Sequence, residues 1–249
     1  MSTDRDPSII SRSVLANGYR INVRVEGDGD PLLLINGLTR SLDSWAPFAH
    51  AMSGRRIVSF DAPGVGESPN SLLPMSIAQL ANLCVAVLDE LGLDRVDVLG
   101  FSLGGAVAQE LAARHATRVR RLVLAATTCG FGSSLVGWDV RESVAILMNG
   151  LVRANPLSTL WRVMAFSTWS SIPFLSTIVA PTLVVCGIHD GVAPIANSRA
   201  LAERIPNATL IELSEGHDLQ ESGAAEQLVR VVDEFLARDV QSIRERSSL

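Results

Sequence analysis

Six short apolar segments alternate along this chain with amphipathic stretches of helical period. The apolar segments are residues 32–35, 56–60, 96–100, 119–125, 182–186 and 209–213. Runs of Val, Ile and Leu that are this continuous predict strands buried on both faces, as in a parallel sheet. The helical stretches are residues 77–91, 106–115, 195–205 and 224–237. The alternation predicts an α/β fold, with helices on both faces of a mostly parallel central sheet.

The first strands follow a different pattern. Residues 12–16 and 19–25 flank the pair Asn17-Gly18. An Asn-Gly pair between two strands favours a two-residue type I′ turn, because both positions tolerate positive φ. The sequence therefore predicts an N-terminal β-hairpin ahead of the alternating units.

The alternation is interrupted once, over residues 130–178, which show helical patterns at 140–152 and 158–167. A helical excursion between two strands of such a sheet is typical of a lid over a binding site. The length suits one domain. We therefore expect a single domain over residues 1–249, with an inserted helical cap at 130–178 and a core made of 11–129 and 179–238.

Composition excludes several classes of function. The net charge is −5, with no concentrated basic segment, so nucleic acid is not an expected partner. The mean hydropathy is +0.28, but no uncharged apolar run reaches the roughly 18 residues of a transmembrane segment. Residues 1–10 are charged and lack the apolar stretch of a secretory signal, which predicts a cytoplasmic protein. The three cysteines match neither a disulfide framework nor a zinc pattern.

A Gly-x-Ser-x-Gly motif stands where a strand gives way to a helix. Gly100-Phe101-Ser102-Leu103-Gly104 follows the apolar run at residues 96–100 and opens the next helix. That context is typical of a nucleophile elbow, a sharp turn that exposes a serine hydroxyl. Glycines on either side allow the neighbouring backbones to pack closely. The motif predicts that Ser102 is a nucleophile.

A serine nucleophile needs a base and an acid that orients the base. The four histidines are His50, His115, His189 and His217. His217 follows the last strand, so it is expected at the same sheet edge as Ser102. Asp190 follows the strand at residues 182–186, and the chain order Ser…Asp…His is typical of such enzymes. We expect Asp190 and His217 to complete a catalytic triad, and we expect Asp218 to lie on the surface.

Acyl transfer also requires donors for the oxyanion. The expected donors are the backbone N–H of Leu103, directly after the nucleophile, and that of Leu38 in the loop at residues 36–39. The sequence contains no His-Glu-x-x-His zinc site and no P-loop. It therefore predicts neither a metal nor a cofactor.

These motifs together resemble the α/β-hydrolase family over essentially the whole chain. The family's Asp-x-Pro-Gly-x-Gly-x-Ser turn is matched by Asp61-Ala62-Pro63-Gly64-Val65-Gly66-Glu67-Ser68. Trp45, which follows Gly37 by eight residues, also matches the family pattern. Most relatives carry His-Gly before the oxyanion residue, whereas this chain has Asn36-Gly37. That departure is similar to intracellular medium-chain-length polyhydroxyalkanoate depolymerases, as are residues 122–127, 155–157, 169–175 and 204–208.

The resemblance implies a serine hydrolase that cleaves carboxylic esters through an acyl-enzyme, with a polyester among the candidate substrates. The sequence leaves other functions open: a small-molecule esterase, lactonase or C–C hydrolase, an acyltransferase or cofactor-free perhydrolase, and a binding protein. Expected partners are a small-molecule or polyester acyl substrate and a hydrophobic granule or lipid surface. The sequence leaves the oligomeric state open.

Aromatic residues indicate where the substrate pocket lies. Residues 130–178 hold half of the aromatic side chains of the chain and only five charged ones. Such a composition favours an apolar mouth above Ser102. The expected lining residues are Asn36, Phe101, Phe131, Trp138, Trp161, Phe166 and Trp169.

Overall fold

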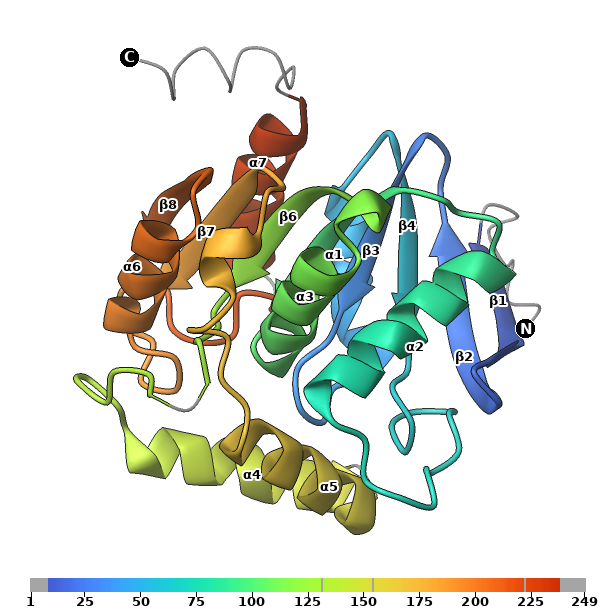
Figure 1. Cartoon of the computed structure of the whole chain (residues 1–249), viewed down its shortest axis with the longest axis horizontal. Coiled ribbons are helices and arrows are strands. Elements are labelled where there is room, and N and C mark those ends of the chain that lie inside the picture. Colours follow the sequence, from blue (N-terminus) through green and yellow to red (C-terminus); the bar gives the residue numbers. More distant parts are fainter. Residues whose placement is uncertain (1–8, 131, 154, 222, 238–249) are drawn as a thin grey trace.

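The computed structural model describes residues 9–130, 132–153, 155–221 and 223–237. Its centre is an eight-stranded sheet of order β1-β2-β4-β3-β5-β6-β7-β8 (Figure 1). The strands are β1 Ile9–Ala16, β2 Tyr19–Glu26, β3 Asp30–Ile35, β4 Arg55–Phe60, β5 Val96–Phe101, β6 Val119–Ala125, β7 Thr182–Gly187 and β8 Ala208–Leu213. β1, β2 and β4 pair antiparallel, and every later pairing is parallel. The predicted α/β fold with a mostly parallel sheet is confirmed.

The N-terminal hairpin forms at the predicted turn. Asn17 and Gly18 have φ of 48° and 79°, the two positive values that a type I′ turn requires. Ala16 pairs with Tyr19 directly across the turn. The hairpin extends the sheet at one edge and leaves the parallel strands at its centre.

Helices cover both faces of the sheet (Figure 1). They are α1 Ala46–Ala51, α2 Ile77–Glu90, α3 Leu103–Arg114, α4 Val140–Arg153, α5 Pro156–Ser167, α6 Ile195–Arg204 and α7 Ala224–Ala237. α2, α3 and α6 contribute to one apolar core, whereas α1 and α7 contribute to the other. None of the described helices is both long and apolar enough to span a bilayer.

The central strand β5 explains why its sequence is continuously apolar. All six of its residues are buried. Val98 packs in the core beneath α2 and α3, and its neighbour Leu99 packs in the core on the opposite face. A strand with successive side chains in two separate cores has no polar face. β5 is therefore held rigidly from both sides, and the residue that follows it is Ser102.

The insertion between β6 and β7 carries α4 and α5. These two helices lie together beyond the ends of the central strands, outside the layers formed by the other helices (Figure 1). Asn155 caps α5 by accepting hydrogen bonds from the backbone N–H groups of Leu157 and Ser158. The division of the chain into a core and an inserted cap stays a prediction.

Candidate active site

Ser102 occupies a strained turn between β5 and α3. Its φ of 53° and ψ of −120° are unfavourable for a residue with a side chain. The glycines around it are required by close packing. A Cβ on Gly100 would lie 2.4 Å from the carbonyl oxygen of Gly104, and one on Gly104 would lie 2.1 Å from the carbonyl oxygen of Ile35. The strand, the turn and the helix are thus locked together around Ser102.

Two further side chains form a hydrogen-bonded chain with the Ser102 hydroxyl. Nε2 of His217 lies 3.1 Å from Oγ of Ser102, and Nδ1 of His217 lies 2.9 Å from Oδ2 of Asp190. His217 and Asp190 are both buried. The other carboxylate oxygen of Asp190 accepts hydrogen bonds from the backbone N–H groups of Val192 and Ala193. These bonds fix the carboxylate, and the carboxylate in turn fixes the imidazole ring.

The remaining histidines lie elsewhere. His115 ends α3 with Nε2 2.8 Å from Oδ1 of Asn82, and His50 is in the last turn of α1. His189 is exposed, although it is adjacent to Asp190. Asp218 forms an ion pair with Arg40. Among the described residues, Asp190 is the carboxylate that pairs with His217.

The loop at residues 36–39 passes directly over Ser102. A Cβ added to Gly37 would lie 3.4 Å from the Cβ of Ser102. Leu38 and Leu103 line the same cavity as Ser102. The Asn36 side chain holds the start of this loop, because its Nδ2 donates to the carbonyl oxygen of Ser41. Both predicted oxyanion residues therefore flank the serine.

A cavity of about 340 Å³ opens from Ser102 toward the α4–α5 insertion. Its walls are mostly apolar and come from both the sheet edge and the insertion. The lining residues are Leu38, Ser102, Leu103, Ala126, Thr127, Thr128, Trp138, Ser143, Ile146, Leu147, Val163, Phe166, Ser167, Val192 and Ala193. A pocket of this size and polarity suits a hydrophobic ligand with few polar groups.

Two of the seven predicted pocket residues, Trp138 and Phe166, line this cavity. Phe131 lies outside the described residues. Asn36 borders a separate small cavity behind the loop. Its side chain is held by hydrogen bonds to neighbouring loop residues. Asn36 therefore lies outside the cavity at Ser102.

Three further aromatic residues of the predicted set do not line the cavity at Ser102. Phe101 is buried below the nucleophile, with its ring centroid 6.3 Å from that of Trp45. Trp169 stacks on Phe166 and donates its indole N–H to Glu110. Trp161 borders another small cavity next to Pro63. These rings pack the structure because a large apolar side chain is most stable where it is enclosed.

Aliphatic residues replace the missing rings in the cavity wall. Ile146 and Leu147 of α4 and Val163 of α5 face the cavity, together with Val192 beyond the Asp190 turn. The aromatic composition of residues 130–178 gives no indication of these residues. Ile146 and Leu147 are adjacent residues of α4, so their type and spacing do not show which side of the helix faces the site.

The insertion is attached to the loop that carries Asp190. The backbone N–H of Asp139 donates to the carbonyl oxygen of Gly191 over 2.7 Å. The backbone N–H of Gly191 donates to Oε2 of Glu142 over 3.2 Å. Burial raises the pKa of the Glu142 carboxyl, and the nearby charge of Asp190 raises it further. These two hydrogen bonds hold the start of α4 beside Asp190.

The fold and this arrangement define a class of protein. Residues 30–144 match the family model of the alpha/beta hydrolase fold. The chain is 33% identical over 243 residues to a poly(3-hydroxyalkanoate) depolymerase from Ectopseudomonas oleovorans, with 85% of this chain and 86% of that protein covered. The chain therefore belongs to the α/β-hydrolase family, and its resemblance to polyhydroxyalkanoate depolymerases is confirmed.

Other relatives have different activities. A 2-hydroxymuconate semialdehyde hydrolase from Pseudomonas putida is 28% identical, with 95% of this chain and 98% of that protein covered. The crystal structure of an enol-lactonase from Burkholderia xenovorans LB400 superposes with a TM-score of 0.81 at 26% identity, covering 91% of this chain and all of that one. The names of these relatives thus describe different hydrolytic activities.

Proposed function

We propose that this protein is a serine hydrolase that cleaves carboxylic esters of hydrophobic acyl groups through an acyl-enzyme. One observation carries the proposal: the hydrogen-bonded chain from Ser102 through His217 to Asp190 stands at the base of an apolar cavity. A hydroxyl, a base and an orienting acid in this geometry are the requirements for nucleophilic acyl transfer.

The first half-reaction forms the acyl-enzyme. His217 accepts the proton of the Ser102 hydroxyl through Nε2 while Oγ attacks the ester carbonyl carbon. Asp190 accepts a hydrogen bond from the Nδ1–H of His217, which holds the ring in the tautomer that leaves Nε2 free as a base, and the carboxylate stabilises the imidazolium. Collapse of the tetrahedral intermediate breaks the C–O bond, and the imidazolium gives its proton to the departing alkoxide.

The second half-reaction is hydrolysis of the acyl-enzyme. Nε2 of His217 removes a proton from a water molecule, whose oxygen attacks the acyl carbon. The intermediate releases the carboxylic acid, and the proton on His217 returns to Oγ of Ser102. In both half-reactions, the backbone N–H groups of Leu38 and Leu103 stabilise the negative charge on the carbonyl oxygen.

We propose a polyester of hydroxyalkanoates as the first candidate substrate. The sequence relationship to a poly(3-hydroxyalkanoate) depolymerase supports it, as does the apolar cavity. The outer surface of the insertion, which we take as a cap over the core, offers a second argument. Val140, Val144 and Met148 of α4 are exposed at a spacing of four residues. Leu157, Leu160 and Met164 of α5 are likewise exposed.

Two apolar stripes on one surface element suit contact with a water-insoluble substrate, such as a polymer granule or a lipid surface. A small lactone or a C–C bond substrate is the second candidate. The fold neighbour that is an enol-lactonase and the P. putida hydrolase favour it. The cavity volume of about 340 Å³ also suits a single small ligand.

The test combines labelling with a substrate series. A fluorophosphonate reacts with an activated serine, so the wild-type protein should be labelled and Ser102→Ala should not. Ser13→Ala, a change on the exposed β1 strand, is the matched control. Hydrolysis of 4-nitrophenyl esters should fall below ~1% in Ser102→Ala, because the nucleophile is lost.

Retention of more than a few per cent of the activity by pure Ser102→Ala protein would refute the proposal. The same preparation separates the two substrate classes. Clearing of an emulsion of medium-chain polyhydroxyalkanoate supports the polyester. Hydrolysis confined to short esters and lactones supports the small-molecule substrate.

A further inference from the structure

Arg162 of α5 is a buried cation at the interface between the insertion and the core. Its exposed fraction is 5%. Among the described residues, no carboxylate forms an ion pair with it. Burial lowers the pKa of its guanidinium to about 10, so the group stays charged at neutral pH. A buried charge without a counter-ion destabilises a fold unless hydrogen-bond acceptors compensate for it.

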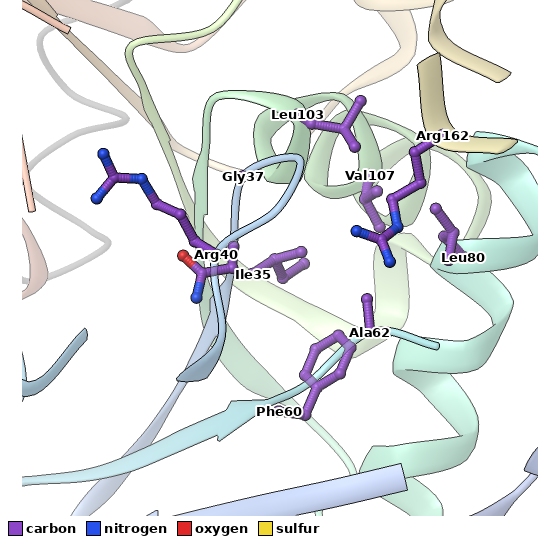
Figure 2. Close-up of a pocket in the computed structure, with 10 residues that line it drawn as sticks. Ile35, Gly37, Arg40, Phe60, Ala62, Leu80, Leu103, Val107 and Arg162 are labelled. Carbon is purple, nitrogen blue, oxygen red and sulfur yellow. The ribbon is translucent and has the colours of Figure 1, made fainter. Parts of the chain in front are cut away.

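The guanidinium donates to two backbone carbonyl groups from separate loops. One nitrogen, Nη1, donates to the carbonyl oxygen of Leu38, and Nη2 donates to that of Pro63 over 2.7 Å. Figure 2 shows Arg162 reaching into the small cavity beside Leu80 and Ala62. Arg162 therefore connects α5 with the loop above Ser102 and with the Pro63 turn.

The Pro63 turn is a rigid support. One carboxylate oxygen of Asp61 accepts from the backbone N–H of Leu42 over 2.7 Å, and the other accepts from that of Glu67 over 3.0 Å. Ser158, one turn before Arg162, donates its hydroxyl to the carbonyl oxygen of Gly64. α5 is thus fixed to the turn at two points, and the Arg162 guanidinium extends from this support to Leu38.

We propose that Arg162 is a positioning residue for the oxyanion hole. By holding the Leu38 carbonyl, it fixes the backbone of this loop and so keeps the Leu38 N–H directed at the carbonyl oxygen of a substrate bound to Ser102. Its positive charge behind the same loop adds to the favourable potential for the oxyanion. This role rests on the proposed serine-hydrolase function.

The experiment uses Arg162→Met, which keeps an apolar stem but removes both donors, and Arg162→Lys, which retains the charge and can reach one carbonyl. The readouts are kcat and KM for a soluble 4-nitrophenyl ester and the inhibition constant of a trifluoromethyl ketone, which forms an oxyanion with the serine. We expect Arg162→Met to lower kcat roughly 10- to 100-fold with KM within about 3-fold of wild type. The ketone should bind more weakly by the same factor, and Arg162→Lys should recover part of both losses.

Arg120→Met is the matched control for a merely structural effect. Arg120 is a partly buried arginine that binds Asp97 at the opposite end of the strands. The Arg120→Met substitution should lower the melting temperature without changing kcat or the affinity for the ketone. Endpoint labelling by a fluorophosphonate counts the folded active sites in each preparation, so that kcat is calculated per competent site.

Two outcomes would overturn the inference separately from the function. An Arg162→Met protein with wild-type kcat and ketone affinity per labelled site removes the positioning role and leaves the hydrolase. If Arg162→Met does not fold, the uncharged Arg162→Gln protein takes its place, and wild-type values per labelled site in it have the same consequence. A wild-type protein that neither reacts with the fluorophosphonate nor cleaves any ester refutes the proposed function itself.

Discussion

Gln220 donates a hydrogen bond from Nε2 to Oδ1 of Asn36 over 2.9 Å, although 184 positions separate the two residues. Gln220 follows His217 by three residues, and Asn36 precedes Leu38 by two. The bond therefore joins the loop of the proposed base to the loop of a proposed oxyanion donor. Both partners are amides, and Gln220 is buried. In a buried site such a bond also fixes the orientation of the two loops.

A double-mutant cycle tests this connection. We expect Asn36→Ala and Gln220→Ala each to lower kcat by roughly 10-fold, because each releases one loop from the other. The double variant should lose little more than either single one, which corresponds to a coupling of about 1 kcal/mol. The measurement is kcat per fluorophosphonate-labelled site in the four proteins. Fully additive losses would show that the bond does not couple the loops.

Substitution of the acid separates Asp190 from its neighbours. Asp190→Asn should lower kcat by about 10³- to 10⁴-fold with little change in KM, because the amide no longer stabilises the imidazolium or selects the reactive tautomer. Asp218→Asn is the control, since Asp218 is adjacent to His217 but pairs with Arg40. The measurement is kcat and KM of both variants and of wild type with one ester under steady-state conditions. An almost unchanged kcat in Asp190→Asn would place the acid elsewhere.

Cavity size should set the preferred acyl chain length. Ile146 of α4 faces the cavity, so Ile146→Phe should shorten it. We expect kcat/KM to fall by about 4-fold for each methylene that no longer fits, while the shortest esters are unaffected. Met148→Phe, on the exposed side of the same helix, is the matched control. If the two variants give the same chain-length profile as wild type, the cavity is not the acyl pocket.

The strands and the positions of Ser102, Asp190 and His217 were predictable because each depends on the sequence immediately around it. β6 has the predicted bounds, and β3, β4, β5, β7 and β8 differ by one or two residues at their ends, since strands buried in two cores need continuous apolar sequence. β1 begins three residues earlier than predicted. Ser102 sits in a strand–turn–helix context that its glycines reveal. His217 and Asp190 follow strands, and parallel strands bring such positions to one edge.

The pocket was less predictable because residue type indicates burial but not direction. Phe101 and Trp169 are apolar and large, and they pack in the core below and beside the cavity. Nothing in the sequence indicated the contacts of Arg162. Its partners are backbone carbonyl groups 124 and 99 positions away, and every residue has a carbonyl. Only the packing of α5 on the Pro63 turn brings these groups together.

The cysteines should be unreactive in the folded protein. Cys84, Cys129 and Cys186 are all buried. Burial raises the pKa of the Cys84 thiol to about 12 and also raises that of Cys186, so neither forms the reactive thiolate at neutral pH. Ellman's reagent should therefore give almost no colour with native protein and three equivalents in guanidinium chloride. Rapid reaction of a native thiol would show that one of these sites opens.

Glu142 should make the thermal stability depend on pH. Burial and the charge of Asp190 raise the pKa of its carboxyl, with a further contribution from Asp139, while His217 opposes the shift. A carboxyl whose pKa is higher in the folded state favours folding below its unfolded pKa, and this contribution is lost as the pH rises through the folded value. Ionised Glu142 is thus unfavourable at neutral pH.

Glu142→Gln removes that charge and keeps an oxygen that can accept from the backbone N–H of Gly191. We expect its melting temperature to exceed that of wild type at about pH 8, and the difference to shrink as the pH falls toward about 3, where the wild-type carboxyl is neutral in both states. Asp43→Asn, a change at an exposed carboxylate far from α4, controls for net charge. A difference that is constant with pH would mean that the substitution acts through packing, and a lower melting temperature at pH 8 would mean that ionised Glu142 holds α4 in place.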